Sequence, residues 1–231
     1  MDVLPEASIY DREHRFMPWG KLIEHVVEKT ETLIPRGGSV LDLACGTGQL
    51  LGNLSRRRPD ITCIGLAIDA NYIAFARKQY PGITYIVGDM RTWNDVASFN
   101  AIVCTGGLHH LSYDEQPPFI RRLPMLLDRG GFAIVADPYI GDYHDETSRK
   151  MAAAKLGYEY LLATIRNGAD DEVIAATAQL IANDVCGLEY KTSIKRLKSV
   201  FHDTFKRVGI RRMWPQQHTD YGDYVVTLKK E

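Results

Sequence analysis

Apolar runs of strand length alternate with helix-like patterns over the first 138 residues. The runs that predict β-strands cover residues 39–45, 61–68, 83–89, 100–106 and 130–138. Predicted helices lie between them at about 49–57, 71–79 and 114–127. Because the runs are apolar on both faces and alternate with helices, the pattern predicts a parallel sheet covered by helices on both sides.

The pattern changes after the fifth run, where residues 146–186 predict two helices and no strand. The apolar residues of the first helix share one face: Met151, Ala154, Tyr158, Leu161 and Ile165. A third helix is expected at about 193–208, ended by Gly209. Two strand-like stretches, "IRRMWPQQ" and "YGDYVVTLKK", close the chain. We therefore expect an α/β fold, a doubly wound, mostly parallel seven-stranded sheet with a C-terminal antiparallel strand and a helical insertion after strand five.

The composition narrows the class of protein. A chain of 231 residues, 45% apolar and 25% charged, suffices for one soluble globular domain. The net charge of −1 argues against a nucleic-acid partner, and no apolar run approaches the roughly 20 residues that span a bilayer. The four cysteines form no Cys-x-x-Cys pair, which favours reduced thiols in a cytoplasmic protein without a zinc site.

A glycine-rich turn follows the first predicted strand, in the stretch "VLDLACGTGQLL" at 40–51. Asp42, Ala44, Gly46 and Gly48 are spaced D-x-A-x-G-x-G, and small residues let a ligand lie close to the backbone. The dinucleotide fingerprint G-x-G-x-x-G fails here, because Leu51 stands where its third glycine belongs. A P-loop is excluded as well, since no Gly-Lys-Ser/Thr follows.

Four motifs in order resemble those of class I S-adenosylmethionine-dependent methyltransferases of the small-molecule type. They are "VLDLACGTG" (40–48), "YIVGDM" (85–90), "FNAIVCTGGLHHL" (99–111) and "LDRGGFAIVADP" (127–138). The resemblance covers residues 39–138 well and the later helices poorly. It implies S-adenosylmethionine as cofactor and S-adenosylhomocysteine as product.

The resemblance also implies a set of cofactor-binding residues. Asp42 would reach the amino group of the ligand, and Asp89 would accept a hydrogen bond from the adenine amine. Thr105 would line the methionine end. The full set of positions implied is Asp42, Ala44, Gly46, Gly48, Ile68, Asp69, Asp89, Met90 and Thr105.

One position departs from the family pattern. Where an acidic residue usually ends strand two and holds the ribose, this chain has Ala67, and Asp69 follows two residues later. Asp69 could take the ribose, or ribose binding could be carried elsewhere with a loss of about 1.5–3 kcal/mol. A third interpretation is a pocket altered for chemistry other than methyl transfer. Asp69 could also simply cap the helix that starts near Asn71.

Two histidines, His109 and His110, follow strand four where the methyl group should emerge, and they are the candidate catalytic bases. A structural role for one or both stays open. A metal site on this pair is not expected, because no third ligand stands nearby at suitable spacing.

The remaining segments are expected to enclose the acceptor. In the resembled family, a helix before strand one folds over the cofactor, which would place Tyr10, His14, Arg15, Phe16 and Trp19 in a lid. Tyr139, Tyr143 and His144 stand at the root of the insertion that would form the other wall. The single domain (1–231) would thus comprise lid helices (1–38), a cofactor-binding core (39–138), a substrate-enclosing insertion (139–190) and a closing segment (191–231).

We therefore expect methyl transfer to an oxygen or nitrogen of a small molecule. The apolar surface of the insertion could pair two copies into a homodimer. Two rival functions stay open: an enzyme that uses or modifies S-adenosylmethionine without ordinary methyl transfer, and a non-catalytic methyltransferase-like subunit. Ala67 supports both rivals, whereas Gly46, Asp89 and His110 count against the second.

Overall fold

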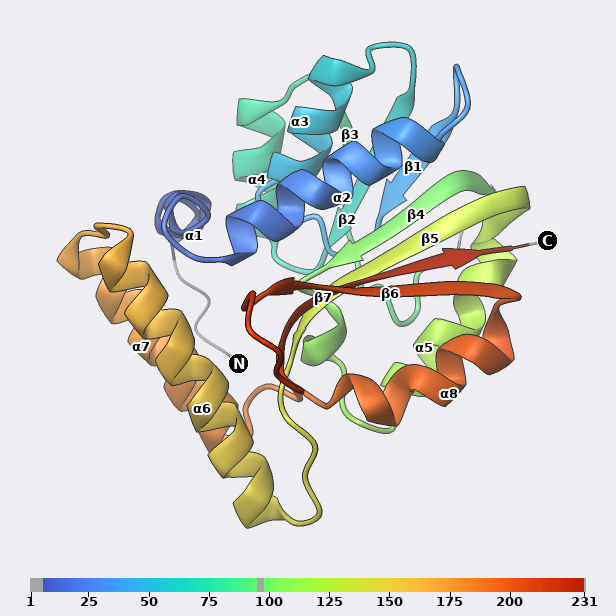
Figure 1. Cartoon of the computed structure of the whole chain (residues 1–231). Coiled ribbons are helices and arrows are strands. Elements are labelled where there is room, and N and C mark those ends of the chain that lie inside the picture. Colours follow the sequence, from blue (N-terminus) through green and yellow to red (C-terminus); the bar gives the residue numbers. More distant parts are fainter. Residues whose placement is uncertain (1–5, 95–97, 231) are drawn as a thin grey trace.

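The computed structural model describes residues 6–94 and 98–230 and contains a seven-stranded sheet (Figure 1). The strands are β1 (Ser39–Asp42), β2 (Thr62–Ala67), β3 (Thr84–Val87), β4 (Phe99–Thr105), β5 (Leu127–Tyr139), β6 (Arg207–Trp214) and β7 (Gly222–Lys229). Their order is β3-β2-β1-β4-β5-β7-β6. Strands β1 to β5 are parallel, and β7 is antiparallel to both β5 and β6. The predicted doubly wound sheet is confirmed.

Helices lie on both faces of this sheet. On one face are α2 (Trp19–Leu33), α3 (Gln49–Arg57) and α4 (Ala70–Gln79), and on the other are α5 (Gln116–Arg122) and α8 (Ile194–Thr204). The short helix α1 (Ala7–Glu13) precedes α2, and two 3-10 turns, η1 (Leu108–His110) and η2 (Leu123–Leu126), flank α5. No helix in the described part of the chain is long and apolar enough to cross a bilayer.

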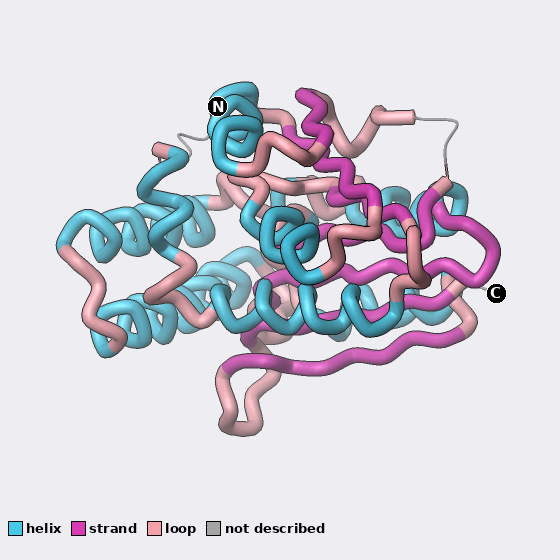
Figure 2. The backbone as a smooth tube through the Cα atoms, turned by 90° about the horizontal axis from the view of Figure 1, so that it is seen from above, coloured by secondary structure: helices cyan, strands magenta, loops and turns pink. Residues whose placement is uncertain are grey.

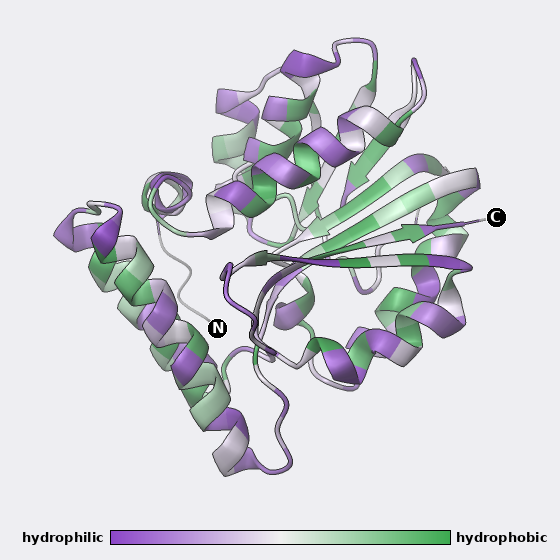
Figure 3. Cartoon of the chain, viewed as in Figure 1, coloured by the Kyte–Doolittle hydropathy of each residue, from purple (hydrophilic) through white to green (hydrophobic). Residues whose placement is uncertain are grey.

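Strand β4 shows why the central runs are apolar throughout. Ala101 and Val103 pack with the α2–α4 layer, whereas Ile102 and Cys104 pack with the α5–α8 layer. Successive side chains of a strand point to opposite faces, so the middle of a strand covered on both sides is apolar, and its polar residues, Asn100 and Thr105 in β4, stand near its ends. The strongly hydrophobic colouring of the central strands in Figure 3 follows from this arrangement.

Two long helices, α6 (Glu146–Arg166) and α7 (Asp171–Cys186), follow β5 and extend beyond the sheet, as Figures 1 and 2 show. Asp145 begins α6 with a reciprocal capping box to Ser148. Gly157 lets the two helices approach closely, since a Cβ there would lie 2.6 Å from the Ile181 side chain. The helices thus pack on each other as one antiparallel pair.

The apolar face that the sequence indicates on α6 is not its buried face. Met151 and Tyr158 are 69% and 59% exposed, and Ile165 is exposed as well. The buried face instead carries Ala153, Leu156 and Tyr160, and Arg149 and Thr164 are buried too. The helix has two apolar stripes, and contacts with α7 and the end of β5 select between them.

The third helix also ends earlier than its pattern predicts. Helix α8 stops at Thr204, and Val208 and Gly209 belong to β6. Val208 lies opposite Leu228 of β7, so strand pairing replaces the last helical turn. Gly209 is therefore a strand residue and does not end the helix.

A matched pair of substitutions tests the buried face of α6. We expect Leu156→Ala to lower the free energy of unfolding by about 2–5 kcal/mol, because it empties a fully buried site. Met151→Ala, on the exposed stripe, should change it by no more than about 0.5 kcal/mol. Urea unfolding of both variants measures the difference, and equal losses would contradict the packing described.

Candidate active site

The glycine turn connects β1 to α3 in a left-handed conformation. Gly46 has φ +52° and Gly48 has φ +80°, a backbone region that favours glycine. A Cβ on Gly48 would also lie 2.4 Å from the Tyr85 hydroxyl. The buried Asp42 accepts a hydrogen bond from the Ala44 amide at 3.2 Å, and burial raises the pKa of this carboxyl to about 7. The turn therefore lies at the carboxyl edge of the sheet and is anchored by the Asp42 side chain.

Three further predicted cofactor residues follow neighbouring parallel strands at the same edge. Thr105 ends β4, and its buried Oγ1 has no hydrogen-bond partner among the described residues. Asp89 follows β3 and accepts hydrogen bonds from the Arg91 amide and guanidinium, the main cause that lowers the pKa of Asp89. Ile68 follows β2 and is 67% exposed. The predicted cofactor residues thus share one edge of the sheet, with half-buried Met90 beside Asp89.

Ala67 is the last residue of β2, and Asp69 is the N-cap of α4. Asp69 Oδ1 accepts hydrogen bonds from the Asn71 amide at 2.7 Å and the Tyr72 amide at 3.0 Å. The capping interpretation therefore describes its local geometry. A ribose contact by Asp69 stays a prediction.

His109 is held by a carboxylate that the sequence analysis did not single out. Asp137 stands near the end of β5, and its Oδ1 lies 2.5 Å from His109 Nδ1. Its Oδ2 accepts hydrogen bonds from the Leu108 and His109 amides at 2.7 and 3.2 Å. Burial lowers the pKa of His109, but the charge of Asp137, its hydrogen bond to the ring and the charge of Glu189 together outweigh burial and raise the pKa above its usual value. Since Nδ1 faces Asp137, the other ring nitrogen, Nε2, is directed away from β5.

Beyond His109 lies a buried network of charges. His109 Nε2 is 3.5 Å from Glu189 Oε2, which is 2.9 Å from Lys191 Nζ. Lys191 also contacts Asp184 Oδ1 at 2.5 Å, and all three partners are less than 9% exposed. Opposite charges alternate along this network, which compensates part of the cost of burying each one.

His110 lies beside His109, with ring centroids 4.2 Å apart, and is the more exposed of the two. Desolvation by the surrounding walls and the charge of His109 lower its pKa, so its ring is neutral at pH 7. The fold also brings Glu189 within 4.8 Å of both histidines, so the expectation that no third ligand stands near the pair is wrong. Glu189 is already paired with Lys191, whose ammonium competes with a metal ion for the same oxygen.

Helix α1 and the start of α2 place aromatic rings over the glycine turn after β1 and over Gly106, which follows β4. Tyr10 lies within 3.5 Å of the Cβ position of Gly46, and the Trp19 ring lies against Gly106. His14 lies between them, edge-on to Tyr10 with ring centroids 5.2 Å apart and stacked on Trp19 with centroids 5.9 Å apart. These three predicted lid residues come together at the site.

Polar contacts hold α1 to both sides of the site. Thr47 Oγ1 of the glycine turn donates to Asp11 Oδ1 at 3.1 Å. Arg12 pairs with Glu172 and Asp170 at the start of α7. The helix therefore bridges the cofactor side and the helical insertion.

A small cavity of about 90 Å³, which we call the inner pocket, lies beneath α1. Its polar walls are Glu13, His109, His110, Asp184, Glu189 and Lys191, and its aromatic walls are Tyr10, Trp19 and Tyr160. The Tyr160 hydroxyl donates to the buried Asp223. Both candidate bases thus meet the lid and the insertion at one cavity.

Other predicted acceptor residues lie outside the inner pocket. Tyr139 is buried in the core, edge-on to Tyr224. Tyr143 packs under the Arg196 guanidinium, and His144 is exposed. Phe16 contributes its carbonyl, which accepts a hydrogen bond from Asn167. The root of the insertion therefore packs on the sheet and leaves the acceptor wall to α6, α7 and the segment after α7.

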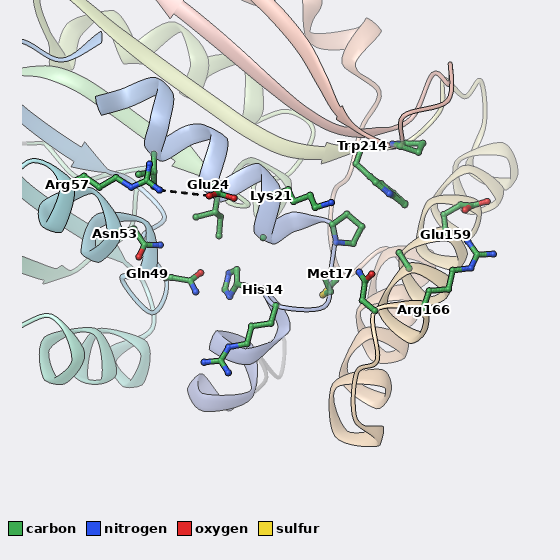
Figure 4. A pocket seen from close by; sticks show the side chains of 18 of the residues that line it. His14, Met17, Lys21, Glu24, Gln49, Asn53, Arg57, Glu159, Arg166 and Trp214 are labelled. Atoms are coloured by element: carbon green, nitrogen blue, oxygen red, sulfur yellow. Dashed lines mark ion pairs between the residues drawn. The ribbon is translucent and has the colours of Figure 1, made fainter. Parts of the chain in front are cut away.

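A larger cleft of about 870 Å³ lies on the outer side of the segment between α1 and α2 (Figure 4). Its charged residues are Arg15, Lys21, Arg56, Arg57 and Arg166, against Glu24 and Glu159. The ion pair drawn in Figure 4 joins Arg57 to Glu24. Met17 lines both this cleft and the inner pocket, so the two spaces are neighbours at this residue.

Comparisons with known proteins agree with this geometry. Residues 40–131 match the model of a methyltransferase domain family. A protein of Bacillus cytotoxicus named as an uncharacterized methyltransferase is 27% identical over 200 residues, which are 84% of this chain and 81% of the relative. These matches support a class I S-adenosylmethionine-dependent methyltransferase. The methyl donor of this class, S-adenosylmethionine, is accordingly the cofactor of the methyltransferase.

Two more similarities cover different shares of the chain. A dTDP-4-amino-2,3,4,6-tetradeoxy-D-glucose N,N-dimethyltransferase of Saccharopolyspora spinosa is 28% identical over 134 residues, 56% of this methyltransferase and 53% of the relative. The structure of a plantazolicin methyltransferase, solved with a monoazolic desmethylPZN analog and S-adenosylhomocysteine, has a TM-score of 0.65 at 12% identity, covering 97% of this chain and 88% of that one. The second similarity shows the shared fold.

Sequence reasoning missed Glu13, Asp137, Asp184, Glu189 and Lys191. Asp137 had a usable signal, because an aspartate at the carboxyl end of a predicted parallel strand lies where ligands bind. The other four stand near the ends of predicted helices, where charged residues usually face solvent. Their burial depends on contacts between distant segments.

The cap of α4 gives a direct test of the Asp69 geometry. We expect Asp69→Ala to lower the free energy of unfolding by about 1 kcal/mol, because two amides of the first turn lose their acceptor. Asp69→Asn should stay within about 0.5 kcal/mol of the native protein, since asparagine caps equally well. Urea unfolding at pH 7 measures both, and an equal loss in the two variants would show that the charge, and not the cap, stabilises the helix.

Proposed function

We propose that the protein transfers a methyl group from S-adenosylmethionine to an oxygen or nitrogen of a small molecule, with His109 as the base. The observation that supports this most directly is the pairing of His109 with Asp137 at the wall of the inner pocket. A carboxylate on Nδ1 keeps that nitrogen protonated and leaves Nε2, which lies 3.5 Å from Glu189 Oε2, as the nitrogen that accepts a proton.

The residues at the edge of the sheet fit the cofactor. Asp42 and Thr105 offer a buried carboxylate and an unpartnered hydroxyl for the methionine end, and Gly46 leaves its backbone uncovered by a side chain of its own. Asp89 with Met90 and Ile68 would hold the adenine. Bound there, S-adenosylmethionine supplies an electrophilic methyl group. The chain aligns the acceptor with it and removes a proton through His109, and alignment is the larger part of such catalysis.

The enclosed pocket supports a small acceptor. Aromatic rings from α1, α2 and α6 surround a cavity that admits only a small group, and such walls suit a small, partly apolar molecule. The similarity to an aminosugar N,N-dimethyltransferase supports nitrogen as the accepting atom. The rival without methyl transfer retains the support of Ala67, whereas the hydrogen-bonded His109–Asp137 pair favours a catalytic protein.

Calorimetric titration with S-adenosylmethionine and S-adenosylhomocysteine tests the cofactor site first. We expect binding in the micromolar range, weakened about tenfold or more in Asp89→Ala by the loss of a charge-assisted hydrogen bond. Release of S-adenosylhomocysteine in the presence of small amines and alcohols then tests transfer. Undetectable cofactor binding in the native protein would overturn the proposal.

The Asp137 carboxylate predicts the pH dependence of the reaction. His109 accepts a proton only when neutral, so kcat/KM should rise with pH and level off, with a midpoint above 6.5 because Asp137 raises the pKa of His109. In Asp137→Asn we expect the midpoint to move to lower pH and kcat to fall about 10²-fold, because the amide can also favour the wrong tautomer.

The other groups that face His109, namely Glu189, Lys191 and His110, are unchanged in this variant. Cofactor affinity measured by calorimetry serves as the control and should stay within about twofold. A midpoint that does not move would exclude His109 as the titrating base.

A further inference from the structure

Glu13 is a buried carboxylate without a partner in the described part of the chain. It is 3% exposed, its Oε1 accepts no hydrogen bond, and none of the described cations pairs with it. A charged carboxylate in such a place is unfavourable unless it is paired, and burial raises its pKa to about 7. The last residue of α1 therefore has unused capacity to accept hydrogen bonds.

The inner pocket, which Glu13 lines, carries an excess of carboxylates. Glu13, Asp184 and Glu189 belong to its wall, and Lys191 is the ammonium that faces them. Lys191 is already shared by Asp184 and Glu189, at 2.5 and 2.9 Å, which leaves Glu13 uncompensated. The charge of His109 is likewise matched, by Asp137 on the far side of its ring. A further positive charge is therefore favourable beside Glu13.

The aromatic walls point to the same class of ligand. Tyr10, Trp19 and Tyr160 line the pocket together with Glu13. Aromatic faces attract cations, with the strongest effect where water is excluded. An ammonium group offers both the charge and the N–H donors that Glu13 lacks, whereas a hydroxyl offers a donor alone and a carboxylate is repelled.

We propose that the inner pocket selects acceptors that carry a protonated amine, and that Glu13 determines this specificity by binding the ammonium group. The inference rests on the proposed function: next to His109, the bound ammonium would give one proton to neutral His109 Nε2, and the nitrogen lone pair so freed would accept the methyl group. It narrows the acceptor from any small molecule to an amine. Glu13 touches the substrate and needs no part in the chemical step.

Ligand-observed NMR titrations with butylamine, butanol and butyrate test the proposal. The three probes share chain length and differ in the terminal group, and butylamine is protonated at pH 7.5, as a lysine side chain is. With protein saturated by S-adenosylhomocysteine, we expect butylamine to bind at least about tenfold more tightly than butanol, and butyrate to bind most weakly.

Two isosteric variants locate the selectivity. Glu13→Gln should lose most of the amine preference, while Glu28→Gln, which removes an exposed carboxylate from α2, should keep it within about twofold. The melting temperature of Glu13→Gln at pH 8 should be no lower than that of the native protein, because a buried unpaired charge is removed. This measurement confirms that the variant is folded.

Three results would overturn the proposal. One is equal affinity of the native protein for butylamine and butanol, and another is an unchanged amine preference in Glu13→Gln. The third is a weaker affinity for S-adenosylmethionine in Glu13→Gln with amine binding intact, which would place Glu13 on the amino group of the cofactor. Failure to bind S-adenosylhomocysteine, with the amine preference of cofactor-free protein retained, would instead overturn the proposed function alone.

Discussion

The candidate active site depends on one carboxylate, that of Asp137, at the carboxyl end of β5. Its two oxygens accept hydrogen bonds from the Leu108 amide, the His109 amide and His109 Nδ1. Strand β5 pairs with β4 on one side and β7 on the other, so the carboxylate stands on an interior strand of the sheet. The ring of His109 is thereby oriented by a central strand, although it belongs to a short turn.

The charges behind His109 also depend on this arrangement. Asp137, His109, Glu189, Lys191 and Asp184 alternate in sign, and each is within reach of its neighbour. Burying any one of them alone would be costly, and its opposite neighbour recovers part of that cost. The members come from β5, the turn after β4, the end of α7 and the segment that follows it. The network therefore connects the cofactor-binding core to the helical insertion through electrostatics as well as through packing.

The features that could be predicted are those determined by residues close together in the sequence. The strands and the glycine turn follow from local patterns, because a strand covered on both faces is predominantly apolar and a left-handed turn favours glycine. The buried face of α6 could not be chosen from its pattern, since Met151 and Leu156 lie on two comparable stripes and contacts with other segments decide between them. Glu189 and Lys191 were missed for the same reason, because their burial is set by α7 and the histidine turn. His109 was predicted from its place after strand four, whereas its partner Asp137 needed the register of β5.

Helix α1 shows how an N-terminal segment becomes part of the site. Asp11 contacts the glycine turn through Thr47, and Arg12 contacts the start of α7. Because these two contacts hold α1 in place, Glu13, the next residue, lies in the wall of the inner pocket. Glu13 is 3% exposed there, and electrostatic interactions of buried groups are stronger than those at the surface. A single carboxylate on a seven-residue helix can therefore influence which acceptor the methyltransferase binds, although the sheet and its glycine turn provide the cofactor-binding framework.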